Sequence, residues 1–557
     1  MIATGNILIL GIVFNTGAAA YTLGTAPGTG SITFNSSGTP SPNITINSGV
    51  TNNQTINANL LNGGNTSFVN NSTTATLSIA GNVALTAAVG ASRTETVRGA
   101  GNTLISGSVS NGTNVSGFTL SLIKSETGTL TLSNNNSYTG ITTINGGVLE
   151  AAVLASGSSN SSIGASSNAA ASLVFGAPAA TLRYTGSSNV TIDRGFTLSS
   201  GAGGGATIES SGTGTLSIDN TVALAYGTSS GSAGTQTRLL TLGGTYVGAN
   251  TFSKVIANNS GTSNLTSVTK AGVGTWVLSG ANTFTGATTI GTSAAGAPLI
   301  TSATANGGTL DSTSNNALGS TSSITVNNGG TLLLTGATTT GGTPGGISNR
   351  VNNSAGVSLG TGGATTGSIG GTIAISGASP VLEGTAISKS GVTTTNSAYA
   401  TASATSVAGF GALTLTSNST LDFGSSTIGT MVFTNFIDPS NAFKLNIIGY
   451  TNTTTNGTTI SGVDGTDDRL VFNSDMSSFI AAGDFTFNGS AVGVSQIALD
   501  SGFYEVTMTA VPEPATWAGG ILLLAATVWT QRRPIRGLCG ALRYSRGWTP
   551  TFGVKSV

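Results

Sequence analysis

The 557-residue chain contains no histidine and a single cysteine, Cys539. Without histidine, it cannot build a Ser-His or Cys-His nucleophilic mechanism. One cysteine excludes an intrachain disulfide and a cysteine-rich zinc site. Charged residues make up only 6% of the chain, against roughly 25% in ordinary soluble proteins. The net charge is zero, and no basic face is evident, so a nucleic-acid partner is not expected.

The residues that are abundant indicate β-structure. Apolar and polar residues alternate in "TLTL" at 129–132, "TLSI" at 215–218 and "LTLT" at 413–416. Period-two alternation rich in Thr, Val and Ile is typical of strands, and the intervening Asn, Gly and Ser clusters are typical of turns. No helical periodicity stands out between residues 21 and 510. The low net charge and positive mean hydropathy disfavour disorder. We therefore predict an all-β chain.

Two internal repeats organise this pattern. "KSETGTLTLSNNNSYTGITTINGGVLEA" spans 124–151, and "KAGVGTWVLSGANTFTGATTI" spans 270–290. The two align without a gap over their shared length. The repeated positions are Lys124 and Lys270, Gly128 and Gly274, Asn136 and Asn282, Tyr138 and Phe284, and Gly140 and Gly286.

Short strands recurring about every ten residues cannot each bury an apolar face alone, but stacked coils can. The pattern therefore predicts a β-solenoid, a right-handed parallel β-helix, over residues 21–430. A terminal β module is expected over 431–510. A set of β-sandwiches stays open as the alternative, because the strand spacing fits it too.

The repeats resemble the autotransporter-associated β-strand repeat, also called the passenger-associated transport repeat. The resemblance covers residues 95–430 in patches and is closest at 124–151 and 270–290. It implies a secreted β-helix and says little about activity. We expect the two lysines to act as polar caps or ladder breakers at coil corners. Tyr138 and Phe284 are expected in the core or in stacking contacts.

A different pattern ends the chain. "VPEPATWAGGILLLAATVWTQRR" at 511–533 resembles the PEP-CTERM sorting signal, with Pro512, Glu513 and Pro514 as its motif and Arg532 and Arg533 as its basic stop. The apolar run between them predicts one short transmembrane helix. The resemblance implies recognition by an exosortase during transient residence in the inner membrane of a Gram-negative bacterium. Delivery to the cell surface or extracellular matrix would follow. A plain membrane anchor is the alternative.

Both extremities depart from this pattern. The tail at 534–557 is atypical, and either a shifted reading frame or a genuine cytoplasmic tail explains it. Residues 1–20 are expected to form a signal peptide with the apolar core "ILILGIVF" at 7–14 and cleavage before Tyr21. No Lys or Arg precedes Arg93, however, so a buried first strand is the alternative.

Few residues suggest chemistry, and we expect no catalytic residue, metal or cofactor. The acidic group Asp464, Asp467 and Asp468 is interpreted as a polar turn paired locally with Arg469, with a Ca²⁺ site as the alternative. Glu126 and Glu150 flank the first repeat and have no counterparts in the second, so a catalytic role is not expected for them. A non-enzymatic surface spacer or adhesin is favoured, with extracellular polysaccharide as a further partner. A polysaccharide-acting enzyme and a self-assembling matrix protein are the alternatives.

Overall fold

The computed structural model divides into two units, Met1–Thr509 and Ala510–Val557. The second unit lies outside the described residues. The structure describes residues 7–34, 43–86, 91–113, 117–176, 180–198, 204–227, 237–259, 264–291, 307–318, 320–327, 329–336, 350–360, 370–377, 381–385, 407–424, 429–440, 442–451, 468–491, 493–499 and 502–508.

Three parallel sheets begin in the first coils of the chain. Sheet A contains β1 (Ile7–Ile9), β4 (Ser31–Phe34), β7 (Asn59–Asn62), β10 (Val83–Leu85) and β13 (Val109–Ser110). Sheet B contains β2 (Gly11–Phe14), β5 (Asn43–Ile46), β8 (Thr66–Asn70), β11 (Arg93–Arg98), β14 (Leu120–Lys124), β16 (Thr142–Ile144), β18 (Leu173–Phe175), β21 (Thr197–Leu198) and β24 (Ala225–Tyr226). Sheet C contains β3 (Thr22–Leu23), β6 (Gln54–Ile56), β9 (Leu77–Ile79), β12 (Thr103–Ile105), β15 (Thr129–Leu132), β17 (Val148–Ala151), β19 (Thr181–Tyr184), β22 (Gly204–Ser210), β25 (Arg238–Gly243), β27 (Thr266–Lys270), β29 (Thr288–Ile290), β31 (Ser323–Val326), β33 (Gly356–Leu359), β37 (Leu413–Leu415) and β40 (Phe436–Ile437).

Two further sheets belong to the later coils. Sheet D contains β20 (Val190–Ile192), β23 (Leu216–Ile218), β26 (Ala249–Phe252), β28 (Thr275–Leu278), β30 (Thr309–Ser312), β32 (Thr331–Thr335), β34 (Thr372–Ser376), β38 (Ser419–Asp422), β41 (Leu445–Ile448) and β43 (Phe485–Phe487). Sheet E has the order β36 (Val407–Ala408), β35 (Val381–Thr385), β39 (Gly429–Phe433), β42 (Arg469–Phe472), β45 (Tyr504–Met508) and β44 (Val494–Ala498).

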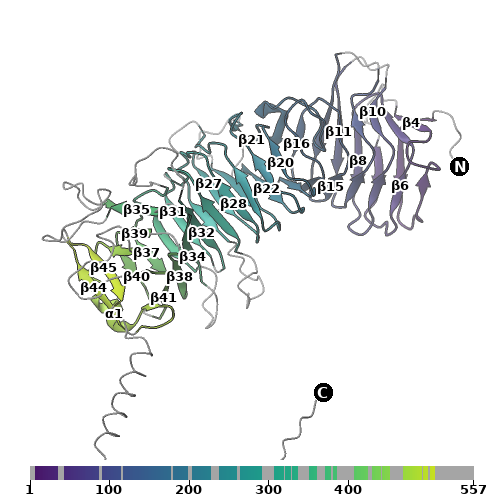
Figure 1. The fold of residues 1–557 in the computed structure, drawn as a ribbon. Coiled ribbons are helices and arrows are strands. Elements are labelled where there is room, and N and C mark those ends of the chain that lie inside the picture. The colour runs from purple at the N-terminus through teal and green to yellow at the C-terminus, as the bar shows by residue number, and fades with distance from the viewer. Residues whose placement is uncertain are drawn as a thin grey trace, which may run out of the picture. The chain divides into compact units, whose positions relative to one another are not determined.

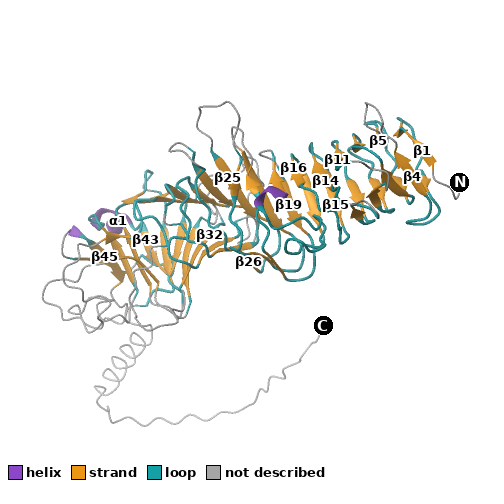
Figure 2. Ribbon diagram, turned by 90° about the horizontal axis from the view of Figure 1, so that it is seen from above, coloured by secondary structure: helices purple, strands orange, loops and turns teal. Residues whose placement is uncertain are grey.

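The strand order shows how the chain winds. In the first coils, each coil adds one strand to sheet A, one to B and one to C, and each strand pairs in parallel with its equivalent in the next coil. Figure 1 shows this succession from β4 and β6 near the N-terminus to β40 and β41. In the residues that the structure describes, Figure 2 shows strands throughout and only two short helical segments. The arrangement is that of a parallel β-solenoid, and it rules out the β-sandwich alternative.

Along the solenoid, two sheets end and a new sheet replaces each of them at the same position of the coil. In chain order, sheet A precedes B, and sheet C follows B. Among the described residues, sheet A has no strand after β13, and sheet D later takes its position between C and B, beginning with β20. Sheet B likewise ends at β24, and sheet E later takes its position between D and C. The solenoid therefore keeps three strand positions, but some coils fill only two of them with strands.

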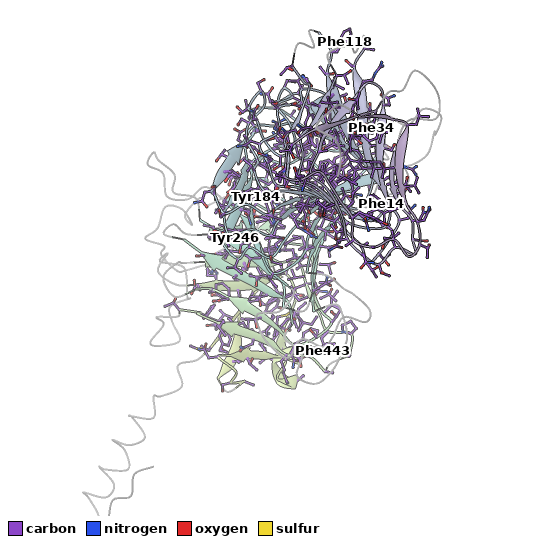
Figure 3. All side chains as sticks on the ribbon, turned by 90° about the vertical axis from the view of Figure 1, so that its right-hand side faces the viewer. Phe14, Phe34, Phe118, Tyr184, Tyr246 and Phe443 are labelled. Carbon is purple, nitrogen blue, oxygen red and sulfur yellow. The ribbon has the colours of Figure 1, made fainter. Side chains whose placement is uncertain are left out.

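Alternating side chains build the core. Within the strands, buried apolar residues alternate with partly exposed polar ones, as in β15, where Leu130 and Leu132 are buried. Phe14 and Phe34, labelled in the N-terminal coils in Figure 3, are also buried. Stacking is tight at the turns as well: a Cβ on Gly81 would lie 2.0 Å from the Ala58 carbonyl oxygen. Only glycine fits such a close approach of two backbones.

The last coils depart from the parallel pattern. β45 pairs antiparallel with both β42 and β44, and α1 (Ser477–Ala482) precedes β43. This short helix, which ends at Gly483 with φ of 73°, differs from the expectation of no helix before residue 510. Its six residues are too few for the hydrophobic periodicity that identifies a helix from sequence. Among the described residues, no helix is both long and apolar enough to cross a membrane.

The run "ILILGIVF" forms β1 and β2, which pair with β4 and β5. Leu10 and Val13 of this run are exposed, at 79% and 58%. The segment expected to be a signal peptide thus has strand geometry in the first coil, with part of its apolar surface facing solvent.

Candidate functional site

The two repeats form the same structural unit twice. Repeat 1 supplies β14, β15, β16 and β17, which alternate between sheets B and C. Repeat 2 supplies β27, β28, β29 and β30, which alternate between sheets C and D. In each repeat, the segment between the second and third strands contains the Asn-x-Tyr/Phe-Thr-Gly sequence and occupies a coil position without a strand. Each repeat therefore lies where one sheet is interrupted.

Where the sheet is interrupted, the side chains of Asn136 and Asn282 form the hydrogen bonds that link one coil to the next. The Oδ1 atom of Asn136 accepts the backbone N–H of Val109 at 2.8 Å, and its Nδ2 donates to the Ser162 carbonyl at 2.8 Å. Asn282 makes the same pair of bonds, from the N–H of Ile256 at 2.8 Å and to the carbonyl of Ala317 at 2.7 Å. The gapless alignment of the two repeats matches these residues but does not indicate their role. Their shared position between turn residues was the available signal.

Lys124 and Lys270 end β14 and β27, and both side chains are buried. Each ammonium donates to backbone carbonyls of the following turn: Lys124 to Ser125 at 2.7 Å and Glu126 at 3.0 Å, and Lys270 to Ala271 and Gly272, both at 2.8 Å. Lys124 also reaches the Gly146 carbonyl, at 3.3 Å, in the next coil. The lysines thus cap carbonyls at coil corners.

Burial works against the positive charge at these corners. It lowers the pKa of Lys270 to about 7 and the pKa of Lys124 to about 8, where the nearby Glu126 carboxylate opposes the shift. The carbonyl oxygens therefore stabilise groups that burial drives toward neutrality. A structural role fits this environment, since both amines are shielded from solvent.

The other repeat residues also pack in the coil. Tyr138 and Phe284 are buried at 0% and 1% exposure, and the Tyr138 hydroxyl lies 2.7 Å from Thr142 Oγ1. A Cβ on Gly140 or Gly286 would lie 2.3 Å from a carbonyl oxygen of the preceding coil. Gly128 and Gly274 stack in the same manner, with equivalent contacts at 2.1 and 2.6 Å. The repeat signature therefore specifies coil geometry.

Replacing Asn282 with leucine should destabilise the solenoid by about 2–4 kcal/mol, because it leaves a buried N–H and a buried carbonyl unpaired. Urea unfolding followed by circular dichroism measures the change. Asn134, whose Nδ2 donates to the Ser106 carbonyl in an exposed bond, offers a control: Asn134→Leu should change stability far less. Equal effects of the two substitutions would contradict the bridging role of Asn282.

A row of charges crosses sheet C beside repeat 1. Arg183 on β19 lies between Glu150 on β17 and Glu209 on β22, and it donates hydrogen bonds to both carboxylates. These three side chains are partly exposed, at 31%, 23% and 23%. The arginine balances the charge of one of the two carboxylates, so the row as a whole carries one negative charge.

The expectation that Glu150 has no counterpart in repeat 2 is wrong. Glu150 pairs with Thr131, and Asp311 pairs with Val277 at the equivalent position of repeat 2. The inserted residues 292–306, which lie outside the described residues, shift the numbering and hide this match. Gly272 takes the place of Glu126, and both have a positive φ, of 68° and 61°.

The expected local pairing of Arg469 is also wrong. Arg469 on β42 forms a buried ion pair with Glu505 on β45, with Nη2 to Oε2 at 3.0 Å. Asp468 is fully buried, and its carboxylate accepts the backbone N–H groups of Gly429 and Thr451, each at 2.7 Å. Antiparallel pairing of β42 with β45, which local sequence could not reveal, brings Arg469 and Glu505 together. Asp464 and Asp467 lie outside the described residues.

Two structural facts bear on the remaining expectations. Within the part of the chain that the structure describes, no three His, Cys, Asp or Glu side chains converge to hold a metal ion. Pro512, Glu513, Pro514, Arg532, Arg533 and the tail at 534–557 all lie outside the described residues.

Comparison with known proteins agrees with the repeat geometry. The passenger-associated transport repeat matches residues 122–151 and 268–292. The chain is 43% identical over 182 residues to the Adhesin BmaC autotransporter of Brucella suis biovar 1 (strain 1330). This alignment covers 31% of the chain but only 5% of that adhesin, so the chain corresponds to a small part of it. No solved structure matches the chain. The chain therefore carries two passenger-associated transport repeats, built into a parallel β-solenoid and similar to part of an autotransporter adhesin.

Proposed function

We propose that the chain is an exported, non-enzymatic surface protein of a Gram-negative bacterium, a β-helical spacer or adhesin. The observation that carries this proposal is that every described residue of the repeat signature is used to build the coil. A rod of such coils projects its outer surfaces away from a point of attachment. Similarity to part of an autotransporter adhesin supports the same role.

We also propose a handedness for the coils and a route by which the chain is exported. The coils wind right-handed, as parallel crossover connections almost always do. Cleavage before Tyr21 removes β1 and β2 during export. The segment 511–533 spans the inner membrane transiently as a short helix, and an exosortase-type enzyme cleaves near Pro512-Glu513-Pro514. The mature protein then resides at the cell surface or in the extracellular matrix, where polysaccharide is a further partner.

A deletion strain tests both parts of this proposal. Complementation with the wild-type gene should restore attachment of cells to a surface several-fold. Complementation with the triple variant Pro512→Ala, Glu513→Ala, Pro514→Ala should not, because the uncleaved chain stays in the inner membrane. Peptide mass spectrometry of the surface fraction checks processing: the mature wild-type chain should end near Pro514, with no peptide from 534–557.

The outcomes separate function from sorting. Normal attachment by the deletion strain would overturn the adhesin role. Surface-located chains that retain peptides from 534–557 would overturn exosortase processing and leave the adhesin role standing.

A further inference from the structure

Removal of residues 1–20 on the proposed export route uncovers the N-terminal end of the solenoid. Three inward side chains of the next coil are at most 1% exposed while that segment is present, and they are Phe34, Ile44 and Ile46. Each lies in parallel register with an apolar, core-packed residue of the removed segment, in the order Ile9, Ile12 and Phe14. Cleavage therefore takes the apolar cover off three core side chains at once.

The same step leaves strand edges without partners. β1 and β2 are the outermost strands of sheets A and B, and their loss makes β4 and β5 outermost. The backbone N–H of Asn47, which donates to the Phe14 carbonyl at 3.1 Å, loses its acceptor. β3 follows the cleavage point and stays in place, because the Thr55 N–H donates to the Tyr21 carbonyl at 2.9 Å. The mature end is therefore one complete coil, formed by β3, β4 and β5, with three open edges.

These three edges lack the protection that edge strands usually carry. Natural edges are blunted by lysine, proline, bulges or inward-pointing charges. The sequences of β3, β4 and β5 are TL, SITF and NITI, which contain no lysine, proline or charged residue. The first charged side chain of the whole chain is that of Arg93. Apart from the amine that cleavage creates at Tyr21, two such ends therefore meet without charge repulsion.

The described residues at the other end of the solenoid are arranged differently. Phe479 of α1 packs on Phe436 of β40, the last strand of sheet C, with ring centroids 5.0 Å apart. Sheet E ends in the antiparallel strands β45 and β44. At most one of the three strand positions, that of sheet D, still offers a parallel edge there. A head-to-tail stack of two copies therefore cannot pair all three edges, whereas two N-terminal ends are identical and can form an isologous contact.

A two-fold axis perpendicular to the solenoid axis brings two N-terminal ends face to face. This rotation reverses the strand direction, so β5 meets β5 of the second copy in antiparallel orientation, and β4 meets β3. Antiparallel pairing satisfies backbone groups at least as well as the parallel pairing that was lost. We infer that the mature chain, if it is cleaved as proposed, forms a head-to-head dimer through the coil of β3, β4 and β5. Both C-terminal ends then point outward, which gives the adhesin two ends for contact.

Two other occupants of this end fit less well than a second copy. A lipid surface would cover the apolar side chains, but it offers no partners for the backbone N–H and C=O groups of three open edges. A single extended peptide can add a strand to one edge and leaves the other two open. A second copy supplies three edges and the same apolar side chains together.

The test starts from the exported chain, purified from cells that carry its gene, so that processing follows the native route. Peptide mass spectrometry identifies the N-terminal residue, which should be Tyr21. Sedimentation velocity should show a concentration-dependent equilibrium between monomer and dimer, without larger species. Small-angle X-ray scattering should give the dimer a maximum dimension nearly twice that of the monomer, because the contact is end to end.

Two matched variants locate the contact. Thr33→Lys, Thr45→Lys places charges on outward, partly exposed positions of β4 and β5, where those of two copies face each other. The dissociation constant of the dimer should rise about tenfold or more. Ala84→Lys, Thr96→Lys adds the same charges to outward positions of β10 and β11, two coils further along sheets A and B, and should leave the constant unchanged.

Charge reversal separates a lost contact from a folding defect. Thr33→Glu, Thr45→Glu should also dimerise weakly alone, but a mixture of the glutamate and lysine variants should form a heterodimer at least as tight as the wild-type dimer.

A monomeric chain that begins at Tyr21 would overturn the dimer and leave signal cleavage standing. Equal weakening by the Ala84, Thr96 variant, or the shorter maximum dimension of a side-by-side pair, would overturn it too. Retention of residues 1–20 would overturn both the dimer and the cleavage step. The attachment assay above depends on none of these measurements, so the adhesin role can fail or hold independently.

Discussion

Replacing Arg469 with leucine should lower the free energy of unfolding of the C-terminal coils by about 3–5 kcal/mol. The Arg469 and Glu505 side chains are 1% and 0% exposed, and they join β42 to β45. Removing the guanidinium deprives the buried Glu505 carboxylate of this ion pair. The expected result is early loss of the β44–β45 pair on unfolding, detected by limited proteolysis and by the urea midpoint.

Two further variants test whether the effect of Arg469→Leu comes from the loss of a buried ion pair. Arg98→Leu breaks the ion pair with Glu126, in which both side chains are more than 40% exposed, so its effect should stay below about 1 kcal/mol. The double variant Arg469→Leu, Glu505→Leu removes both buried charges and should recover much of the lost stability. A single variant as stable as the wild type would show that the ion pair does not hold the C-terminal strands.

Glu95→Gln should remove a pH dependence of stability. Glu95 on β11 is fully buried, where Asn62 Nδ2 donates to its Oε2 at 2.8 Å and the Thr66 hydroxyl bonds the same oxygen. Its other oxygen, Oε1, has no hydrogen-bond partner among the described groups. Burial raises the pKa of Glu95 from 4.5 to about 8, and the two hydrogen bonds only partly offset this effect.

The sign of the pH dependence follows from the raised pKa. The folded chain holds the Glu95 proton more tightly than the unfolded chain, so stability is greatest below pH 4.5 and falls as pH rises through about 8. The total loss is on the order of 5 kcal/mol. Glutamine resembles the protonated acid, so Glu95→Gln should lose this fall in stability between pH 4.5 and about 7, below the pH at which Lys270 and Lys124 lose their protons. Urea midpoints at several pH values measure it.

The control for Glu95 is a carboxylate in solvent. Glu126→Gln changes a side chain that is 47% exposed and should keep the fall in stability that Glu95 causes between pH 4.5 and about 7. If Glu95→Gln shows the same fall in stability with pH as the wild type, Glu95 is not the group responsible.

Local pattern in the sequence is enough to predict strands such as "TLTL" at 129–132, because alternation follows directly from one buried face. The pairing of coils is harder, because their lengths vary. Glu95 meets Asn62 across 33 residues, whereas Arg469 meets Glu505 across 36. An insertion separates Asp311 from the rest of its repeat, so the alignment of the two repeats does not match it with Glu150. Those contacts depend on which coil lies above which, and no local signal encodes that.

The two repeats contribute strands to different sheets, and this determines which side of the solenoid the outward residues of each repeat face. The strands of repeat 1 belong to sheets B and C, whereas the equivalent strands of repeat 2 belong to C and D. Equal positions in the two repeats therefore point in different directions around the solenoid axis. A residue copied by duplication of this repeat would not extend a single stripe along the molecule. It would reach partners on another side, so duplication can increase the number of directions in which one molecule makes contact.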